Sequence, residues 1–326
     1  MKKSYYCEKL EKTLHFLPDE IKFCCSCTEG LGIKLEGFSN INKEKIYKTK
    51  EEYIEKFKKG IVPQKCVGCP EYKERGNKFS LSELFQSKNI NKVEYIIVDH
   101  FKQCDCDCVY CSQAVFYPNV LQNYELLPLV KQLYSKNMIG QNLHVEFQGG
   151  NISLLKEFNS LVNEFQQHGC KKFTFISNMI KNMPELQQIS SVTDSYICVS
   201  LDSGKQETFK KIKGLDAFNS VTQNIRELTV NSSAKLKLKY IVLQGLNDNS
   251  EELRSFLEFA KSLPHIDCVI LDIDYRDTFM PKEKRFDVPQ HYYQLFEMAE
   301  NYCKENNLPF YTFEHTKAVL NAGYAD

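Results

Sequence analysis

Residues 93–111 read VEYIIVDHFKQCDCDCVYC, an apolar run followed at once by four cysteines within eight residues. The run Val93–Asp99 has the apolar and β-branched content of a strand. The cysteines Cys104, Cys106, Cys108 and Cys111 then fall on one short loop. No structural role needs so many thiols there, so the stretch predicts metal chemistry at the end of a strand.

Composition indicates an ordinary globular protein. The chain has 326 residues, 42% of them apolar and 12% aromatic, enough for one large domain and an appendage. Its 42 basic and 42 acidic side chains cancel, so no net field recruits nucleic acid or an acidic membrane surface. No segment holds 18 uncharged apolar residues, and residues 1–17 carry charges throughout. We therefore expect a cytoplasmic protein with neither nucleic-acid nor membrane partners.

The cysteine count supports metal binding. In a reducing compartment, clustered cysteines among the 14 are more often metal ligands or redox centres than disulfides. Five of them form an N-terminal group, Cys24, Cys25, Cys27, Cys66 and Cys69. We interpret the five scattered ones as buried small hydrophobic residues: Cys7, Cys170, Cys198, Cys268 and Cys303.

From Val93 onward, apolar β-branched runs alternate with amphipathic stretches, the pattern of repeated βα units with a parallel sheet. The predicted strands are Val93–Asp99, Leu143–Phe147, Lys172–Ile176, Ser195–Leu201, Leu236–Leu243 and Cys268–Ile273. The predicted helices are Tyr124–Lys136, Leu154–His168, Met183–Ile189, Ala217–Leu228, Ser250–Leu263 and Gln290–Asn306.

Six βα units are two short of a closed eight-stranded barrel, so the prediction is an α/β fold with a partial, open (β/α)6 TIM-like barrel. Residues 86–326 would form this barrel and a C-terminal helix. Residues 1–85 are rich in Lys and Glu and broken by Gly and Pro, with one helix expected over Lys50–Lys59. We expect them to form a small Cys-rich metal-binding module.

In such a fold, ligands bind where strands end and βα loops begin. Every predicted strand here ends in polar or Gly-rich residues. After the cysteine loop, these ends are Gln148-Gly149-Gly150-Asn151, Ser177-Asn178, Ser200-Leu201-Asp202-Ser203-Gly204, Gln244-Gly245-Leu246-Asn247-Asp248 and Asp272-Ile273-Asp274-Tyr275. The sequence therefore predicts a ligand-binding rim.

Cys104-x-x-x-Cys108-x-x-Cys111, with Tyr110 before the last cysteine, resembles the cluster-binding signature of the radical S-adenosylmethionine (radical SAM) enzymes. The resemblance covers roughly residues 90–280 and includes the double glycine, Ser177-Asn178, Ser200-Leu-Asp and Asn247 in the family's order. The segment from Ser200 through Lys213-Gly214 to Asn224 also resembles the subgroup that modifies peptides and proteins.

The resemblance implies a 4Fe–4S cluster bound by Cys104, Cys108 and Cys111. Three thiolates leave one iron open, whereas a cube with four is closed and suited mainly to electron transfer. In the family, the open iron binds the methionyl amino and carboxylate groups of S-adenosylmethionine. An electron, from an external donor such as flavodoxin or ferredoxin, then releases a 5′-deoxyadenosyl radical that abstracts a substrate hydrogen.

The resemblance also assigns the cofactor contacts. Tyr110 would lie near the adenine, and the loop Gly149-Gly150-Asn151 would receive the methionyl amino group through backbone carbonyls. The family usually has Gly-Gly-Glu, so Asn151 removes a carboxylate that could help neutralise the ammonium. Contacts to the ribose or the carboxylate would come from Ser177, Asn178, Ser200, Asp202 and Asn247. Each of these is also a common turn residue.

Two groups of cysteines leave alternatives open. We interpret Cys106 as a bystander thiol, although it could exchange into the cluster if a ligand is lost. Cys24-x-x-Cys27 and Cys66-x-x-Cys69 have the layout of a four-cysteine metal site. We expect this site to hold an auxiliary 4Fe–4S cluster, with zinc as the alternative, and Cys25 could replace Cys24.

The substrate is less constrained. Asp272, Asp274 and Tyr275 end the sixth strand and are candidates for substrate contact or proton transfer, with loop capping as the alternative. Cys198 shares parity with Ser200 and could return a hydrogen atom to a substrate radical, with core packing as the alternative. We interpret the Lys235, Lys237 and Lys239 alternation as a solvated face, and His100 and His144 as structural.

Three functions remain from the sequence. The first is a radical SAM enzyme acting on a peptide, a protein or a small metabolite. The second is a non-catalytic iron–sulfur or zinc protein that binds a partner, which does not explain the Gly149-Gly150 loop. The third is a thiol oxidoreductase that uses Cys108-Val-Tyr-Cys111, which explains neither Cys104 nor the polar strand ends.

Overall fold

The computed structural model describes residues 3–24, 31–35, 43–66, 72–74, 92–116, 124–231, 235–274 and 288–322. The chain divides into two compact units. Unit 1 comprises residues 1–102, 119–150 and 155–173, and unit 2 comprises residues 103–118, 151–154 and 174–326. The cysteine loop therefore belongs to unit 2, and the double glycine belongs to unit 1.

The sheet of unit 1 has the strand order β7-β6-β2-β3-β4. β6 pairs in parallel with both β7 and β2, whereas β3 and β4 are antiparallel additions, and β1 pairs separately with β5. N-terminal residues thus extend the sheet beside its first predicted strand. The bounds are β1 (Tyr5–Cys7), β2 (Thr13–Phe16), β3 (Glu20–Lys22), β4 (Gly32–Lys34), β5 (Tyr72–Glu74), β6 (Val93–Val98) and β7 (Ile139–Phe147).

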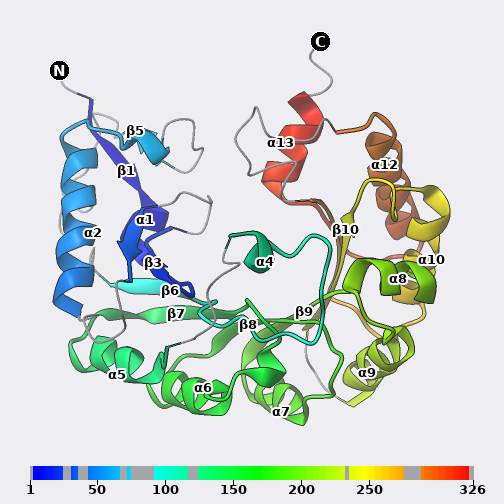
Figure 1. Ribbon diagram of the computed structural model, residues 1–326, viewed down its shortest axis with the longest axis horizontal. Helices are drawn as coiled ribbons and strands as arrows, with labels where there is room; N and C mark the ends of the chain where they lie inside the picture. The colour runs from blue at the N-terminus through cyan, green and yellow to red at the C-terminus, as the bar shows by residue number, and fades with distance from the viewer. Residues whose placement is uncertain are drawn as a thin grey trace. The chain divides into compact units, whose positions relative to one another are not determined.

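The helices of unit 1 pack through aromatic side chains. The Phe147 ring of β7 contacts the rings of Phe158 and Phe165 on α6, at 5.3 and 6.5 Å between centroids. α5 and α6 lie on the same side of β7 (Figure 1). The bounds are α1 (Glu8–Lys12), α2 (Lys43–Lys58), the 3-10 helix η2 (Gln64–Cys66), α5 (Leu127–Ser135) and α6 (Phe158–Gln167).

The strands of unit 2 follow the order β12-β11-β10-β9-β8, and β9 to β12 are parallel. Their register places Cys198, Lys237 and Cys268 side by side across β9, β10 and β11. The bounds are β8 (Lys172–Ser177), of which 174–177 belong to this unit, β9 (Asp194–Ser200), β10 (Lys235–Val242), β11 (Cys268–Ile273) and β12 (Phe310–Tyr311).

Local sequence signals fix the helices of unit 2. Asn249 caps α10 by accepting a hydrogen bond from Glu252 N at 3.0 Å. Gly214 ends α8 with a φ of +69°, a conformation that glycine adopts without strain. The bounds are α4 (Ser112–Phe116), η4 (Ile152–Leu154), α7 (Pro184–Val192), α8 (Gln206–Lys213), α9 (Phe218–Asn231), α10 (Ser250–Lys261), α12 (His291–Glu305) and α13 (Glu314–Ala322).

Each sheet has one apolar and one polar face, because side chains alternate along a strand. In unit 2, Val199 and Leu238 are fully buried, and the Tyr240 ring packs 4.9 Å from Phe256 of α10. In unit 1, Ile96 and Val145 are fully buried in the same way. The polar face of unit 1 carries Tyr95, Asp99, Glu146 and Gln148, and that of unit 2 carries Tyr196, Ser200, Lys237, Lys239 and Asp272.

The structure confirms the predicted α/β class with repeated parallel βα units. All six predicted strands occur, as β6 to β11, and all six predicted helices occur, as α5, α6, α7, α9, α10 and α12. The helix expected over Lys50–Lys59 is the second half of α2. The short elements β1 to β5 and α8 were not predicted. The division at residue 85 into a Cys-rich module and a barrel stays a prediction.

Candidate active site

The cysteine loop is fixed by main-chain hydrogen bonds to the end of α8. Asp107 N donates to Lys213 O at 2.9 Å, and Val109 N donates to Ile212 O at 3.0 Å. A Cβ on Gly214 would lie 2.9 Å from Asp107 O, so glycine is needed where the loop meets the helix. The loop position therefore depends on the helix that the sequence did not predict.

A buried ion pair lies beneath the cysteine loop. Lys213 Nζ is 2.5 Å from Asp202 Oδ2 and 2.6 Å from the Tyr110 hydroxyl, which donates to the same carboxylate at 2.6 Å. The Lys213 side chain is 3% exposed, and that of Asp202 is fully buried. Burial lowers the pKa of an ammonium group, but the attraction of Asp202 together with that of Cys108 and Cys106 outweighs burial and raises the pKa of Lys213 above its usual value. Lys213 is thus a fixed cation beside the loop.

The four thiols of the loop are free, and Cys104 is exposed while the other three are half-buried. The Cys106 thiol hydrogen-bonds to Cys104, which lowers the pKa of Cys104 to about 6. The same kind of bond lowers the pKa of Cys108, whereas donation to both neighbours raises the pKa of Cys106. Burial raises the pKa of Cys111. Two predicted ligands are therefore disposed to be thiolates, the form that binds metal.

The thiols of the cysteine loop are a donor set of the kind that iron–sulfur clusters use. Across the described ranges, no three His, Cys, Asp or Glu side chains converge on one metal ion. A cube binds each thiolate at a different iron, so its ligands need not converge on one point. Lys213 supplies positive charge near Cys104, Cys106 and Cys108, and this charge helps to lower the pKa of Cys104 and of Cys108. The donor set therefore fits the predicted cluster.

Asn178, directly after β8, is drawn to the same thiols. Its Nδ2 lies 3.4 Å from Cys106 Sγ and 3.8 Å from Cys104 Sγ. Its neighbour Ser177 is buried and accepts a hydrogen bond from Met179 N at 3.1 Å. Asn178 is thus brought to the cysteine loop, whereas the Ser177 hydroxyl serves the turn after β8.

Hydrogen bonds connect the end of β9 to the end of β10. Asn247 Nδ2 donates to Asp202 O and Ile241 O, both at 2.8 Å, and Asn247 Oδ1 accepts from Leu243 N at 2.7 Å. Asp202 has a φ of +59° and accepts a hydrogen bond from Ile241 N at 2.8 Å. Both residues are fully buried, and Ser200 is half-buried. The hydrogen bonds of Asp202 and Asn247 to other protein groups therefore fix the backbone of the rim.

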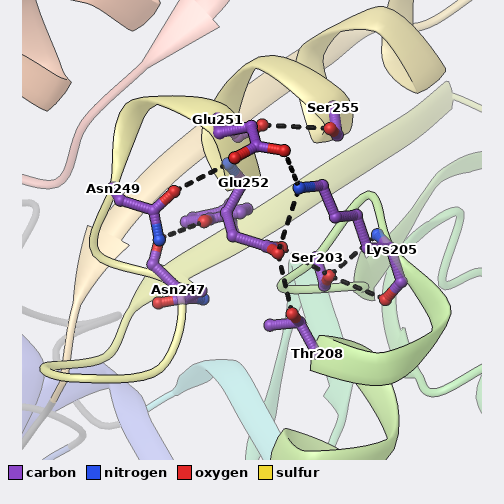
Figure 2. A network of polar contacts seen from close by, with 9 residues as sticks. Ser203, Lys205, Thr208, Asn247, Asn249, Glu251, Glu252 and Ser255 are labelled. Carbon is purple, nitrogen blue, oxygen red and sulfur yellow. Dashed lines mark hydrogen bonds and ion pairs between the residues drawn. The ribbon is translucent and has the colours of Figure 1, made fainter.

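Further hydrogen bonds connect the loop after β9 to α10 (Figure 2). The buried Glu252 carboxylate accepts from Ser203 Oγ at 3.1 Å and Thr208 Oγ1 at 2.8 Å. A Cβ on Gly204 would lie 2.2 Å from Ser255 C, so the loop touches the helix backbone. The loop that begins at Asp202 is therefore held from both sides.

Asn151 bonds the cysteine loop directly. Its Nδ2 donates to Asp105 Oδ2 at 2.8 Å, and its N donates to Gln103 O at 2.7 Å. Asn151 is 2% exposed. A glutamate here, as the radical SAM family usually has, would place a second carboxylate against Asp105. Asparagine at position 151, in place of the family's usual glutamate, therefore avoids a second negative charge beside Asp105 and donates a hydrogen bond to it.

The double glycine lies in unit 1 against the end of β6. Gly149 has a φ of +104°, and a Cβ there would lie 2.5 Å from Asp99 Oδ1. Gly150 N donates to Phe101 O at 3.0 Å. Only glycine fits at 149, because both the backbone conformation and the contact exclude a side chain.

The end of β11 carries another buried network, which sequence reasoning missed. Asp272 Oδ2 is 2.9 Å from Lys239 Nζ, and its Oδ1 accepts from Thr316 Oγ1 of α13 at 2.5 Å. Burial raises the pKa of a carboxyl group, but Lys239 and the hydrogen bonds outweigh it and lower the pKa of Asp272 well below its usual value. The Lys239 side chain is only 21% exposed, so its interpretation as part of a solvated face was wrong.

The remaining predicted residues are placed as follows. Asp274 is 4% exposed directly after β11, and Cys198 is 8% exposed on the polar face of β9. His100 is structural, because it bonds Glu157, which accepts hydrogen bonds from the first turn of α5. Cys24 and Cys66 are half-buried in unit 1. Tyr275, Cys25, Cys27 and Cys69 lie outside the described residues.

No described helix has the length and apolar content that a membrane span needs. No protein-family model matches the sequence. Relatives from several bacteria are named GTP 3′,8-cyclase. That of Clostridium botulinum (strain Hall) is 25% identical over 183 residues, 54% of this chain and 56% of the relative. That of Helicobacter pylori (strain 26695) is 29% identical over 175 residues, 52% and 53% of the two chains. The chain thus spans about half the length of these relatives.

Solved structures show the same fold. Streptococcus suis SuiB bound to its precursor peptide SuiA aligns with a TM-score of 0.54 and 12% identity, over 98% of this chain and 75% of that one. The enzyme anSMEcpe with bound AdoMet aligns with a TM-score of 0.51 and 17% identity, over 66% and 60% of the two chains. The partial TIM-like barrel predicted from the sequence is therefore the observed fold. The chain thus shares its fold with SuiB and anSMEcpe, and over about half its length it is similar in sequence to proteins named GTP 3′,8-cyclase.

Proposed function

We propose that this protein binds a 4Fe–4S cluster through Cys104, Cys108 and Cys111 and uses it to cleave S-adenosylmethionine reductively. The observation that carries the proposal is the cysteine loop itself. Main-chain bonds to Lys213 and Ile212 fix it, and its predicted ligands carry free thiols beside a buried cation. The resemblance of the cysteine spacing to the radical SAM signature, the partial sequence similarity to GTP 3′,8-cyclases and the fold shared with SuiB support the same proposal.

The bound cofactors supply the electron transfer and the radical that abstracts a substrate hydrogen. The protein residues hold and insulate them. Lys213, Asp202 and Tyr110 fix the loop from below, and the Tyr110 ring packs against Ile212, Ile241 and Leu243. This apolar cluster excludes water from one side of the loop. In the proposal, Tyr110 also borders the adenine.

The proposal also assigns cofactor contacts to the glycine loop and to the residues that follow β8, β9 and β10. Backbone carbonyls of Gly149, Gly150 and Asn151 would receive the methionyl amino group. Asn178 already approaches the thiols, whereas Asp202 and Asn247 are committed to protein partners. We propose that these two act mainly by shaping the rim. The proposed ribose and carboxylate contacts are those of Ser177, Asn178 and Ser200.

We also propose a second metal centre, an auxiliary 4Fe–4S cluster or zinc, on Cys24, Cys27, Cys66 and Cys69. The support is the paired Cys-x-x-Cys spacing in the sequence. Metal counts on the protein lacking Cys104, Cys108 and Cys111 distinguish the two. About four residual irons support the cluster, and one zinc overturns it.

The proposed substrate is a peptide or protein side chain. The support is the fold that SuiB, solved with a precursor peptide, shares with 98% of this chain. A nucleotide is the second candidate, because relatives 25% and 29% identical to this chain are named GTP 3′,8-cyclase. Asp274, Tyr275 and Cys198 are proposed for proton or hydrogen-atom transfer to the substrate. Asp274 and Cys198 are both nearly buried, as groups inside a reaction chamber would be.

The cleavage of S-adenosylmethionine is tested on protein purified and reconstituted without oxygen. Dithionite, or a flavodoxin or ferredoxin donor, is added with S-adenosylmethionine, and 5′-deoxyadenosine is measured. Formation by the wild type and none by the Cys108→Ala variant supports the proposal. A fully loaded cluster that yields none with peptide, GTP or no substrate contradicts it. Consumption of peptide but not GTP decides the substrate class.

A further inference from the structure

Three neighbouring strands of unit 1 bring polar side chains together at one edge. Asp99 follows β6 directly, His15 lies on β2, and Gln148 follows β7. Asp99 Oδ2 lies 3.0 Å from His15 Nε2 and 3.2 Å from Gln148 Nε2. Asp99 is 7% exposed and His15 is 9% exposed. We call these three residues the Asp99 group.

The Asp99 group touches the glycine loop. A Cβ on Gly149 would lie 2.5 Å from Asp99 Oδ1, so the glycine Cα is in contact with the carboxylate. The loop follows the same short stretch of chain, because Gln148 N bonds Val98 O at 2.9 Å and Gly150 N bonds Phe101 O at 3.0 Å. A buried carboxylate therefore stands beside backbone that carries no side chain.

A desolvated ammonium needs an anionic or strongly accepting partner. The family's usual third residue, glutamate, could give one, but this chain has Asn151, whose amide is committed to Asp105 at 2.8 Å. The carboxylate at the glycine loop is instead Asp99, which reaches it from the preceding strand.

We propose that Asp99 pairs electrostatically with the methionyl ammonium of S-adenosylmethionine and replaces the carboxylate that Asn151 lacks. This inference rests on the proposed function. His15 and Gln148 are positioning residues, because they hold one carboxylate oxygen and so aim the group at the loop. The N-terminal strand β2 is then part of the cofactor site, since it supplies His15.

The test compares two adenosyl ligands. S-adenosylmethionine carries the ammonium, and 5′-methylthioadenosine lacks the whole amino-acid part. In Asp99→Asn, which keeps the side-chain shape, we expect the Kd of S-adenosylmethionine to rise about tenfold or more, a loss of about 1.4 kcal/mol. The Kd of 5′-methylthioadenosine should stay within about twofold. Equilibrium dialysis on the reconstituted protein measures both.

His15 is tested by a pair of variants. His15→Leu removes the partner of Asp99, whereas His15→Gln keeps a nitrogen donor near the position of Nε2. We expect the Leu variant to weaken S-adenosylmethionine binding about threefold to tenfold and the Gln variant to restore most of it. Tyr95→Phe is the matched control, because it loses the Glu146 bond on the same face and leaves the Asp99 group intact.

The binding results distinguish a failure of the Asp99 inference from a failure of the proposed function. Equal weakening of both ligands by Asp99→Asn, or no weakening of either, overturns the inference. Wild type that binds 5′-methylthioadenosine but not S-adenosylmethionine contradicts the proposed function instead. If Asp99→Asn does not fold, the Kd values of both ligands are measured in His15→Leu instead. A rise of about threefold or more for S-adenosylmethionine alone then supports the pairing, and an equal change for both ligands, or no change, overturns it.

Discussion

The cysteine loop of unit 2 and the glycine loop of unit 1 are fixed in opposite ways. The cysteine loop offers side chains, and its backbone is held by Lys213 and Ile212. The glycine loop offers backbone, and a neighbouring side chain, Asp99, is pressed against it. The cysteine loop is therefore anchored through the part that its proposed ligand does not use, whereas Asp99 both packs against the glycine loop and is proposed to pair with the ligand. Changes at Lys213 should weaken the cysteine loop without touching a ligand contact, and changes at Asp99 should affect both the loop and the ligand.

The largest expected effect is loss of the cluster from the cysteine loop. Replacing Cys104, Cys108 and Cys111 together with Ala should remove about four irons per chain, because no thiolate ligand remains. Iron counts after reconstitution measure this. Cys170→Ala is the control, since Cys170 is buried in unit 1 and bonds Leu143 O. An unchanged iron count in the triple variant would contradict the assignment.

The next effect breaks the anchor of the cysteine loop. Lys213→Met leaves Asp202 buried without its cation, so the free energy of unfolding should fall by about 3–5 kcal/mol. Urea unfolding measures it. Lys210→Met on the same helix is the control, because its Asp216 pair is exposed and should matter by less than about 1 kcal/mol. Equal effects would mean that the buried pair does not anchor the loop.

Gly149→Ala breaks the glycine loop instead. The added Cβ meets Asp99 and forces a φ of +104° on alanine, so unfolding should become easier by about 2–3 kcal/mol. Gly169→Ala separates the two causes, because Gly169 also has a positive φ but has nothing within 4 Å of an added Cβ. Gly169→Ala should lower the free energy of unfolding by only about 1 kcal/mol. A loss at 149 no greater than at 169, in urea unfolding, would show that the Asp99 contact is loose.

Asp272 lies at neither loop, and its buried pair with Lys239 provides a reference for the effect of such a pair elsewhere in unit 2. Its folded pKa is depressed, so its contribution to stability is complete above the unfolded value of about 3.9 and is lost as pH falls toward the folded pKa. Asp272→Asn should therefore lower the free energy of unfolding by about 2 kcal/mol at pH 7 and by less at pH 3. Asp194→Asn, an exposed pair with Lys235, is the control. A pH-independent difference would exclude the ionised pair as its cause.

The smallest effect concerns Cys106. If it is a bystander, Cys106→Ala keeps about four irons in the loop and cleaves S-adenosylmethionine at close to the wild-type rate. Cys106 hydrogen-bonds to both Cys104 and Cys108, so it lies close enough to act as a ligand and the variant can distinguish the two roles. Loss of iron comparable to that of Cys104→Ala would make Cys106 a ligand.

The sequence predicted the barrel well because its strands are long apolar runs. β11 was predicted at both ends, and the other five strands within a few residues. α8 was missed because Gln206–Lys213 holds only two large apolar residues, Phe209 and Ile212. β3 and β4 were missed because each has three residues, and two of the three in β3 are charged.

The candidate site was only partly visible in the sequence, for a related reason. Spacing along the chain identified the cysteine loop and the glycine loop. It could not show that Thr316, far along the chain, bonds Asp272, or that His15 bonds Asp99. Such partners follow from strand order and register, which alternation alone does not specify. The burial of Lys239 was missed for the same reason.

The most direct test of the account is whether S-adenosylmethionine binds the open iron of the reduced cluster. Electron–nuclear double resonance on the reconstituted protein, with ¹⁵N in the methionyl amino group, reads this contact without any substrate. The account predicts a ¹⁵N coupling in the wild type that persists in Cys106→Ala. A fully loaded, reduced cluster without this coupling, in the presence of saturating S-adenosylmethionine, would contradict it.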